Sequence, residues 1–136
     1  MAMRGLVAIL ALESAMACEG EREQEVRREA GRLSRSIDEL RAASNAEKRP
    51  RLLAMRQLTC SEKDVCKARD ACVDAYAHYV RSVEAKNAVR RDLDNDGGSD
   101  RSAELLERSR RDLERSRELN RKCLAEQGAL RRRYRL

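Results

Sequence analysis

Apolar residues recur with a helical period along three stretches of the chain. Between residues 21 and 45 they are spaced by four, three, four and three positions and form one stripe: Val26, Ala30, Leu33, Ile37 and Leu40. This spacing is typical of a helix that packs in the manner of a coiled coil. The polar run SNAEKRP follows, and because the residue before a proline disfavours helix, we expect the helix to end before Pro50.

A second helix is predicted from about residue 51 to 93, with a weak point near Ser61. Ser61 and Asp64 have the spacing of a helix N-cap and its partner three residues on, so the helix can restart there and leave Cys60 just outside it. The second helix then continues to the aspartates near residue 93.

A third helix is predicted over about 100–133, where one heptad is repeated. LERSRRD at 106–112 is followed directly by LERSREL at 113–119. One column of this repeat holds small residues that lead to a cysteine and a leucine: Ser102, Ser109, Ser116, Cys123 and Leu130. Small side chains let helix backbones approach closely, so we expect this column to face another helix.

The stretch DLDNDGGSD between the last two helices has two interpretations. Asp92, Asp94 and Asp96 followed by Gly97 resemble the start of an EF-hand calcium loop. The twelfth position of such a loop needs a bidentate glutamate, and Ala103 stands there. We therefore favour a turn and keep calcium binding at the three aspartates as the alternative.

The turn interpretation makes a distance prediction. Gly97 and Gly98 permit the backbone conformation at the end of one helix, and Ser99 or Asp100 can cap the next. If the hairpin is centred between the glycines, facing residues have numbers that sum to about 195. Cys72 and Cys123 meet this rule, so we expect them to form a disulfide. The diverging helices of an EF-hand would hold these cysteines too far apart, because each is over 20 residues from the loop.

Cys60 and Cys66 are expected to form the second disulfide. A bond from either residue to Cys72 within a continuous helix is sterically excluded, whereas Cys60–Cys66 is possible if the helix breaks between them. A redox-active pair and an intermolecular bridge are the alternatives. The regular spacing of the cysteines up to His78 does not predict zinc, because six residues rotate the side chain by about 240° and raise it about 9 Å. We interpret His78 as a surface residue.

Composition favours long helices over a compact globular core. Charged residues make up 40% of the 136 residues, and the chain has no Phe or Trp. Few aromatics and high charge also suit a disordered chain, but the heptad pattern favours helix. We predict a single all-α domain over residues 18–136, an elongated helical hairpin within an up-down-up three-helix, coiled-coil-like bundle. Disulfides would staple it, because its apolar core is small.

The N-terminus predicts export. One basic residue, Arg4, precedes the apolar run GLVAILAL, and Ala15 and Ala17 on either side of Met16 form an A-x-A site. These features are typical of a secretory signal over residues 1–17, and the apolar run is too short for a permanent membrane span. Disulfides agree with export, because they persist in oxidising compartments.

Cys18 directly follows the A-x-A site, and this segment resembles the lipobox of bacterial lipoproteins. In that class the cysteine is lipidated and becomes the mature N-terminus. The class usually has leucine three residues before the cysteine, where this chain has Ala15. The resemblance implies a membrane anchor at Cys18 and a location in the periplasm or bacterial cell envelope. Ordinary signal cleavage, which would leave Cys18 as a thiol, and an uncleaved helix are the alternatives.

The excess positive charge lies in the last helix. Residues 101–136 have twelve basic and six acidic groups, whereas residues 19–100 are balanced. The chain ends in LRRRYRL, with four arginines: Arg131, Arg132, Arg133 and Arg135. A solvated helix end explains them through the helix dipole. A contact with anionic lipid headgroups or acidic envelope polymers is the more specific hypothesis.

No catalytic triad, P-loop or paired carboxylates can be named from the sequence, and no cofactor is predicted. We therefore expect a non-catalytic envelope protein, lipid-anchored at Cys18, that has a structural role or binds a partner, such as a helical protein, through its helical faces. One alternative is a calcium-responsive helix–loop–helix protein. Another is a cytosolic nucleic-acid-binding helix pair, which requires that the N-terminal signal is not real.

Overall fold

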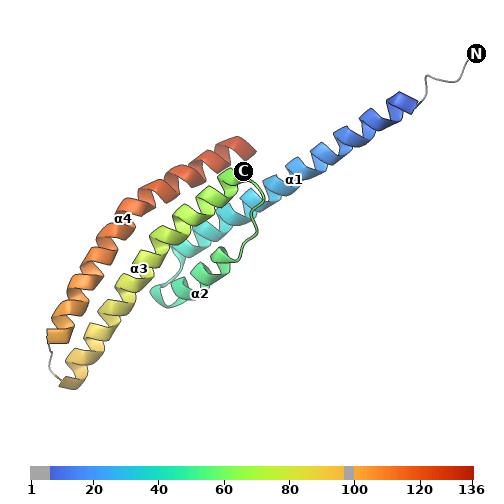
Figure 1. The fold of residues 1–136 in the computed structure, drawn as a ribbon. Coiled ribbons are helices and arrows are strands. Elements are labelled where there is room, and N and C mark those ends of the chain that lie inside the picture. Colours follow the sequence, from blue (N-terminus) through green and yellow to red (C-terminus); the bar gives the residue numbers. More distant parts are fainter. Residues whose placement is uncertain (1–6, 97–99) are drawn as a thin grey trace, which may run out of the picture.

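The computed structural model describes residues 7–96 and 100–136, with side chains from residue 20 onward except that of Asp96. The described chain consists of helices without strands (Figure 1). The helices are α1 (Val7–Ala42), α2 (Asn45–Arg56), α3 (Lys63–Asp96) and α4 (Asp100–Tyr134). The all-α prediction is therefore confirmed, but the described part has four helices where three were predicted.

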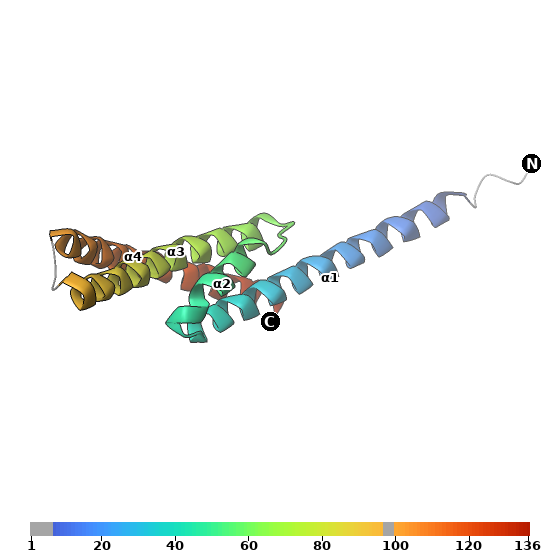
Figure 2. The ribbon, with the colours of Figure 1, turned by 90° about the horizontal axis from the view of Figure 1, so that it is seen from below.

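The helices run up, down, up and down. α3 and α4 form a long antiparallel hairpin, and α1 lies beside the half of it that is far from the turn (Figures 1 and 2). α1 runs parallel to α3 (Figure 1), and the short α2 returns between them in contact with both (Figure 2). The predicted three-helix order was wrong because α2 was not recognised as a separate helix that reverses the chain.

The boundary between α1 and α2 lies at residues 43 and 44 rather than at the proline. Ser44 caps α2 in an extended conformation, and the Glu47 carboxylate accepts hydrogen bonds from its N–H (3.2 Å) and its hydroxyl (2.9 Å). Pro50 lies inside α2. The first helix therefore ends before Pro50, near the predicted residue 45, but the prediction that Pro50 causes the break and that the next helix begins after it was wrong. A proline removes one hydrogen bond, here to the Ala46 carbonyl, and the Ser44–Glu47 pair sets the start of the helix.

Lys48 joins α2 to the end of α1. Its ammonium group is buried and donates to the carbonyls of Leu40 (3.0 Å), Arg41 (3.2 Å) and Ala43 (2.8 Å). Burial lowers the pKa of this group from its ordinary value of 10.5. The last carbonyls of a helix lack partners within the helix and carry partial negative charge. A lysine there donates hydrogen bonds to these carbonyls and also balances their charge.

The predicted second helix is divided at residues 57–62, and α3 begins at Lys63. The break near Ser61 was therefore predicted correctly, but the predicted cap formed by Ser61 and Asp64 is not found. The Ser61 N–H and hydroxyl both donate to the buried carboxylate of Glu29, at 2.7 and 2.9 Å. Asp64 instead accepts hydrogen bonds from Tyr134.

The core follows the predicted apolar stripe of α1 and the small column of α4. All five stripe residues are at most 5% exposed: Val26, Ala30, Leu33, Ile37 and Leu40. The column is also buried: Ser102, Ser109, Ser116, Cys123 and Leu130. Ser109 lies against Ser82 of α3, with the two hydroxyl oxygens 3.0 Å apart. Small residues thus let α3 and α4 pack closely.

Cys72 of α3 and Cys123 of α4 form a disulfide inside this interface. Their Cα atoms are 4.5 Å apart, and both residues are fully buried. This is the pair that the hairpin register predicted. The turn residues Gly97, Gly98 and Ser99, on which that register was based, lie outside the described residues.

Candidate functional site at the arginine-rich end

The end of the bundle farthest from the hairpin turn gathers arginines from two helices. The C-terminus of α4 lies beside α1 there, at the point where α1 leaves the bundle (Figure 2). We name this region the arginine-rich end and define it by the arginines at positions 27, 28, 32 and 35 of α1 and at positions 131, 132, 133 and 135.

The four predicted C-terminal arginines have different contacts. Arg131 donates to the Ser34 hydroxyl (2.9 Å) and pairs with Asp38. Arg133 lies 2.9 Å from the Asp64 carboxylate of α3. Arg132 and Arg135 are exposed. Arg131 and Arg133 therefore hold helices together, which leaves the other two as the more available charges of the predicted patch.

A groove of about 510 Å³ runs between α1 and the end of the chain. Its lining residues are Gln24, Arg27, Arg28, Gly31, Arg32, Arg35 and Leu136. Arg28 and Arg32 both pair with Glu25, at 2.7 and 3.2 Å. Hydrogen bonds from Arg32 and then Arg28 lower the pKa of the Glu25 carboxyl below its ordinary value of 4.5. The lining thus holds four arginines, of which Arg28 and Arg32 pair with Glu25, and the groove suits an anion.

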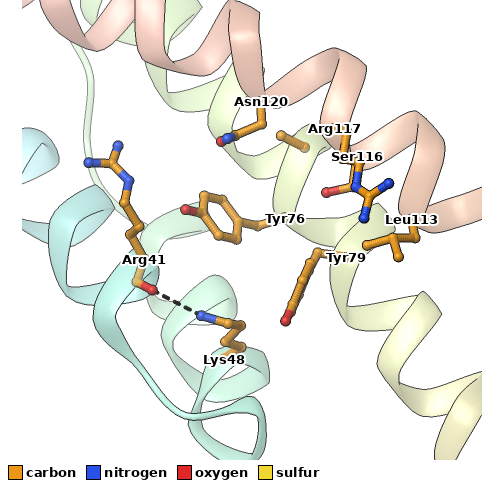
Figure 3. Close-up of a pocket in the computed structure, with 9 residues that line it drawn as sticks. Arg41, Lys48, Tyr76, Tyr79, Leu113, Ser116, Arg117 and Asn120 are labelled. Carbon is orange, nitrogen blue, oxygen red and sulfur yellow. Dashed lines mark hydrogen bonds between the residues drawn. The ribbon is translucent and has the colours of Figure 1, made fainter.

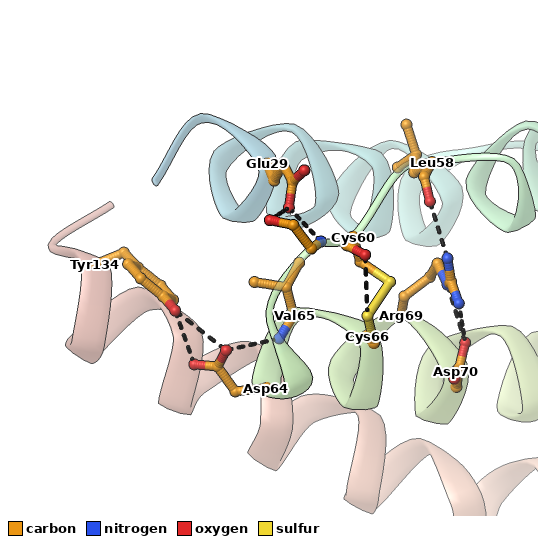
Figure 4. The surroundings of a disulfide bond; sticks show 10 residues. Glu29, Leu58, Cys60, Asp64, Val65, Cys66, Arg69, Asp70 and Tyr134 are labelled. Atoms are coloured by element: carbon orange, nitrogen blue, oxygen red, sulfur yellow. Dashed lines mark hydrogen bonds and ion pairs between the residues drawn. A yellow bond between two sulfur atoms is a disulfide. The ribbon is translucent and has the colours of Figure 1, made fainter. Parts of the chain in front are cut away.

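On the other side of the arginine-rich end, Tyr134 contacts α3. Its hydroxyl donates to the Asp64 carboxylate, with oxygen distances of 3.0 and 3.1 Å (Figure 4). Burial, followed by this hydrogen bond, raises the pKa of the Tyr134 phenol above its ordinary value of 10.0. The tyrosine within the arginine run is therefore part of the interface between α3 and α4.

The second disulfide closes the loop that precedes α3 (Figure 4). Cys60 and Cys66 are half-buried, with Cα atoms 5.2 Å apart, and Cys66 lies in the first turn of α3. This is the second pair that the sequence predicted. Arg69 also donates to the Leu58 carbonyl at 3.0 Å, and Glu29 holds Ser61 as described above. The loop at residues 57–62 is therefore fixed to both α1 and α3.

Cys18 belongs to α1. The N-terminal part of α1 projects beyond the bundle (Figures 1 and 2). The side chain of Cys18 is outside the description, so lipidation stays a prediction. Four residues further on, the Arg22 guanidinium lies 2.8 Å from the Glu62 carboxylate, where α1 already contacts the bundle. A group attached at Cys18 would thus be close to the arginine-rich end.

The predicted calcium ligands are at the opposite end. Asp92 accepts a hydrogen bond from the Ser102 hydroxyl at 3.4 Å, Asp94 is exposed, and the side chain of Asp96 is not described. Among the described residues, no group of three or more His, Cys, Asp or Glu could hold a metal ion. α3 and α4 also pack against each other as far as the Cys72–Cys123 bond, unlike the diverging helices of an EF-hand.

Sequence reasoning missed the partner of the only histidine. His78 was expected at the surface, but it is half-buried, and its Nδ1 lies 2.6 Å from the Asp112 carboxylate. Arg81 approaches the same nitrogen at 2.7 Å. The residue numbers 78 and 112 sum to 190, so the hairpin register could have placed the two side chains at neighbouring levels.

The sequence matches no protein-family model, and comparisons with curated proteins and with solved structures find no similar protein. Within the part of the chain that the structure describes, no helix is both long and apolar enough to cross a membrane.

Proposed function

We propose that this chain is an exported, non-catalytic helical protein, anchored to a membrane by a lipid on Cys18, with its arginine-rich end toward anionic headgroups. It serves as a scaffold or binds a partner protein through the helical faces that point away from the membrane. The observation that carries this proposal is that α1 leaves the bundle at the same end where the C-terminal arginines lie (Figure 2).

The distances along α1 support this orientation. At a rise of about 1.5 Å per residue, Arg22 would be about 6 Å and Arg27 about 14 Å from Cys18 along the helix axis. The field of an anionic membrane surface decays over a Debye length, about 8–10 Å at physiological salt. A lipid on Cys18 would therefore hold Arg22 within one Debye length of the membrane surface and Arg27 within about two, where the field is weaker.

The contacts of this end also suit a scaffold. Its ion pairs connect α1 to the loop before α3, as in Arg22–Glu62, and α4 to α1 and α3, as in Arg131–Asp38 and Arg133–Asp64. The two disulfides support export, because such bonds persist in oxidising compartments.

Mass spectrometry of the protein purified from its native membrane tests the anchor. We expect the mature chain to begin at Cys18 with a diacylglyceryl group, and Cys18→Ala to shift the protein to the soluble fraction. An intact Met1 would overturn the proposal of export.

Vesicle sedimentation tests the orientation. The chain from residue 18, with Cys18→Ser, should bind phosphatidylglycerol vesicles and not phosphatidylcholine vesicles. Replacing Arg27, Arg28, Arg35 and Arg132 by glutamine should remove most of this binding. The matched control replaces four exposed arginines near the hairpin turn by glutamine: Arg90, Arg91, Arg101 and Arg108. An equal loss in both variants would contradict the proposed orientation.

A further inference from the structure

The surface of the α3–α4 hairpin that binds α1 continues beyond the end of α1. α1 ends at Ala42, beside the middle of the hairpin, and the half that holds the end of α3 and the start of α4 extends past it (Figure 1). A cavity of about 480 Å³ lies where α1 stops, and Arg41 of α1 lines it together with Tyr79 of α3 and Leu113 of α4 (Figure 3). The surface that begins at this cavity therefore continues the one that α1 covers.

The heptad register of α4 identifies which arginines lie on this surface. The buried column of small residues in α4 faces α3. A residue one position after a column member is turned about 100° from it, and a residue one position before is turned by the same angle the other way. Arg131 follows Leu130 of the column and pairs with Asp38 of α1, so the residues after the column lie on the α1 side. Arg110 and Arg117 occupy the same position in the uncovered half.

Leucines of α4 continue the α1-binding surface beside these arginines. Leu106 and Leu113 occupy the heptad position of Gln127, whose amide nitrogen donates to the Ser34 carbonyl of α1 at 3.1 Å. Leu113 also lines the cavity at the end of α1, as Arg117 does. The contacts at the cavity thus agree with the register.

α3 contributes apolar side chains to the same surface. Tyr76 and Tyr79 line the cavity. Val83 lies one heptad after Tyr76, and Leu93 lies two heptads after Tyr79. Residues one heptad apart share a side of the helix, so the apolar surface extends along α3 toward its C-terminal end.

We name this surface the distal face. Its residues are Val83, Leu93, Leu106, Arg110, Leu113 and Arg117. Leu93 and Leu106 are 52% and 51% exposed, whereas Leu33, Ile37 and Leu40, which α1 packs against the hairpin, are at most 1% exposed. The distal face is therefore an apolar surface, bordered by arginines, in the place where a further helix could extend the bundle.

The charge of the distal face indicates an acidic occupant. Arg110 and Arg117 are both exposed, and Arg110 bonds Glu107 at 2.9 and 3.1 Å. On the covered half, the equivalent Arg131 is met by the Asp38 carboxylate of α1. A second copy of this chain fits poorly, because a two-fold interface would bring the same arginines against each other.

We propose that the distal face binds an acidic amphipathic helix of a partner protein, laid along the hairpin in line with α1. Apolar residues of this helix, spaced by three and four, pack against the leucines, and its carboxylates pair with Arg110 and Arg117 as Asp38 pairs with Arg131. The inference rests on the proposed function, because it names the partner and the face of a protein whose opposite end is directed at the membrane.

Fluorescence anisotropy of an acidic peptide with the full chain, disulfides intact, tests this proposal. The labelled peptide has about three heptads, with leucine at positions a and d and glutamate at e and g, so its own copies repel one another. We expect a dissociation constant at or below about 100 μM, as for a weak transient interface. A peptide with lysine in place of glutamate should bind at least about tenfold more weakly. No binding of the acidic peptide at about 1 mM, or equal binding of the two peptides, would overturn the proposal.

Two pairs of arginines locate the contact. Arg110→Gln with Arg117→Gln should weaken binding of the acidic peptide by at least about tenfold. The matched control is Arg108→Gln with Arg115→Gln, which removes two charges at the positions before the buried serines, on the opposite side of α4. The control should weaken binding by less than about threefold, because salt screens distant charges. Equal losses would show that binding follows overall charge and would contradict the proposed face.

A pair of leucines separates helix docking from attraction of any polyanion. Leu93→Gln with Leu106→Gln should weaken binding at least about tenfold and leave the melting temperature nearly unchanged, because both side chains are already half exposed. Leu53→Gln, at a leucine of α2 that is 48% exposed, should bind as the unchanged chain does. Binding that survives the loss of Leu93 and Leu106 would overturn the proposal.

Sedimentation of the full chain tests the competing occupant. We expect the same mass for the unchanged chain and for the Leu93→Gln, Leu106→Gln variant. A dimer that is lost in this variant would show that a second copy covers the distal face and would overturn the proposal. The lipid anchor and the membrane orientation are measured separately, by mass spectrometry and vesicle sedimentation, so a failure of peptide binding would leave them standing.

Discussion

At the scale of single residues, buried polar side chains connect the helices of this protein. Lys48, Glu29 and Gln127 are each at most 7% exposed, and each bonds groups of another helix or loop. The sequence predicted the buried apolar residues of α1, because burial requires their spacing. It did not predict Lys48 or Glu29, because a buried charge in a polar run has the same letters as a solvated one.

Lys48→Met tests the link between α1 and α2. Methionine keeps most of the volume but leaves the carbonyls of Leu40, Arg41 and Ala43 without their donor. We expect the free energy of unfolding to fall by about 1–3 kcal/mol, measured by urea denaturation. Lys86→Met, at an exposed position of α3, should change it little. Equal effects of the two substitutions would show that the Lys48 contacts do not stabilise the fold.

Glu47→Gln tests the cap of α2 through its pH dependence. Hydrogen bonds from the Ser44 hydroxyl and N–H lower the pKa of Glu47 below its ordinary value of 4.5. The folded state therefore prefers the ionised form, and this contribution is present above about pH 4.5 and disappears as the pH falls through the lowered pKa. The unchanged chain should exceed the variant in stability at pH 7, with the difference shrinking toward pH 3. A stability difference that stays constant from pH 7 to pH 3 would show that the ionised Glu47 carboxylate does not stabilise the cap.

At the scale of helices, the pairing of α3 with α4 could be predicted, whereas α2 could not. The position of a hairpin turn fixes the register of both helices, so two glycines sufficed to predict that Cys72 meets Cys123. α2 was missed because it begins at the Ser44–Glu47 cap and continues through Pro50, whereas the next helix was predicted to begin after Pro50. The cavity lined by Arg41, Lys48, Tyr76 and Tyr79 (Figure 3) was missed for the same reason, since it forms where α1 stops and α2 turns back.

Removing the two disulfides separately should give unequal losses. Cys72–Cys123 spans 51 residues and Cys60–Cys66 spans six. Loop-closure entropy predicts a cost of about 4 kcal/mol for the first and about 2 kcal/mol for the second. Denaturant unfolding of Cys72→Ala with Cys123→Ala, compared with Cys60→Ala with Cys66→Ala, measures this. The opposite order would mean that strain or residual structure, rather than loop length, determines their contributions.

At the scale of the whole molecule, the two ends differ in character. The arginine-rich end lies where α1 departs, and the end of α3 and the start of α4 lie at the far end (Figure 1). The sequence indicated the charge of residues 101–136 but could not place it beside the arginines of α1, because that depends on how α1 and α4 pack. The proposed membrane orientation follows from this packing.

Salt should weaken the binding of the chain to anionic vesicles. Exposed charges are screened as the Debye length falls from about 10 Å at 0.1 M salt to about 3 Å at 1 M. We expect sedimentation with phosphatidylglycerol vesicles to be lost over this range when Cys18 carries no lipid. Binding that persists at 1 M salt would indicate an apolar contact with the bilayer instead.

The Cys72–Cys123 bond also changes what a protease can do to this molecule. Residues 72 to 123 form a covalent ring that contains most of the hairpin. One peptide cut anywhere between these cysteines opens the ring but releases no fragment. The arginine-rich C-terminal part of α4 would remain attached to the rest of the chain until the Cys72–Cys123 disulfide was reduced. A nicked protein would thus migrate as one band without reductant and as two bands with it.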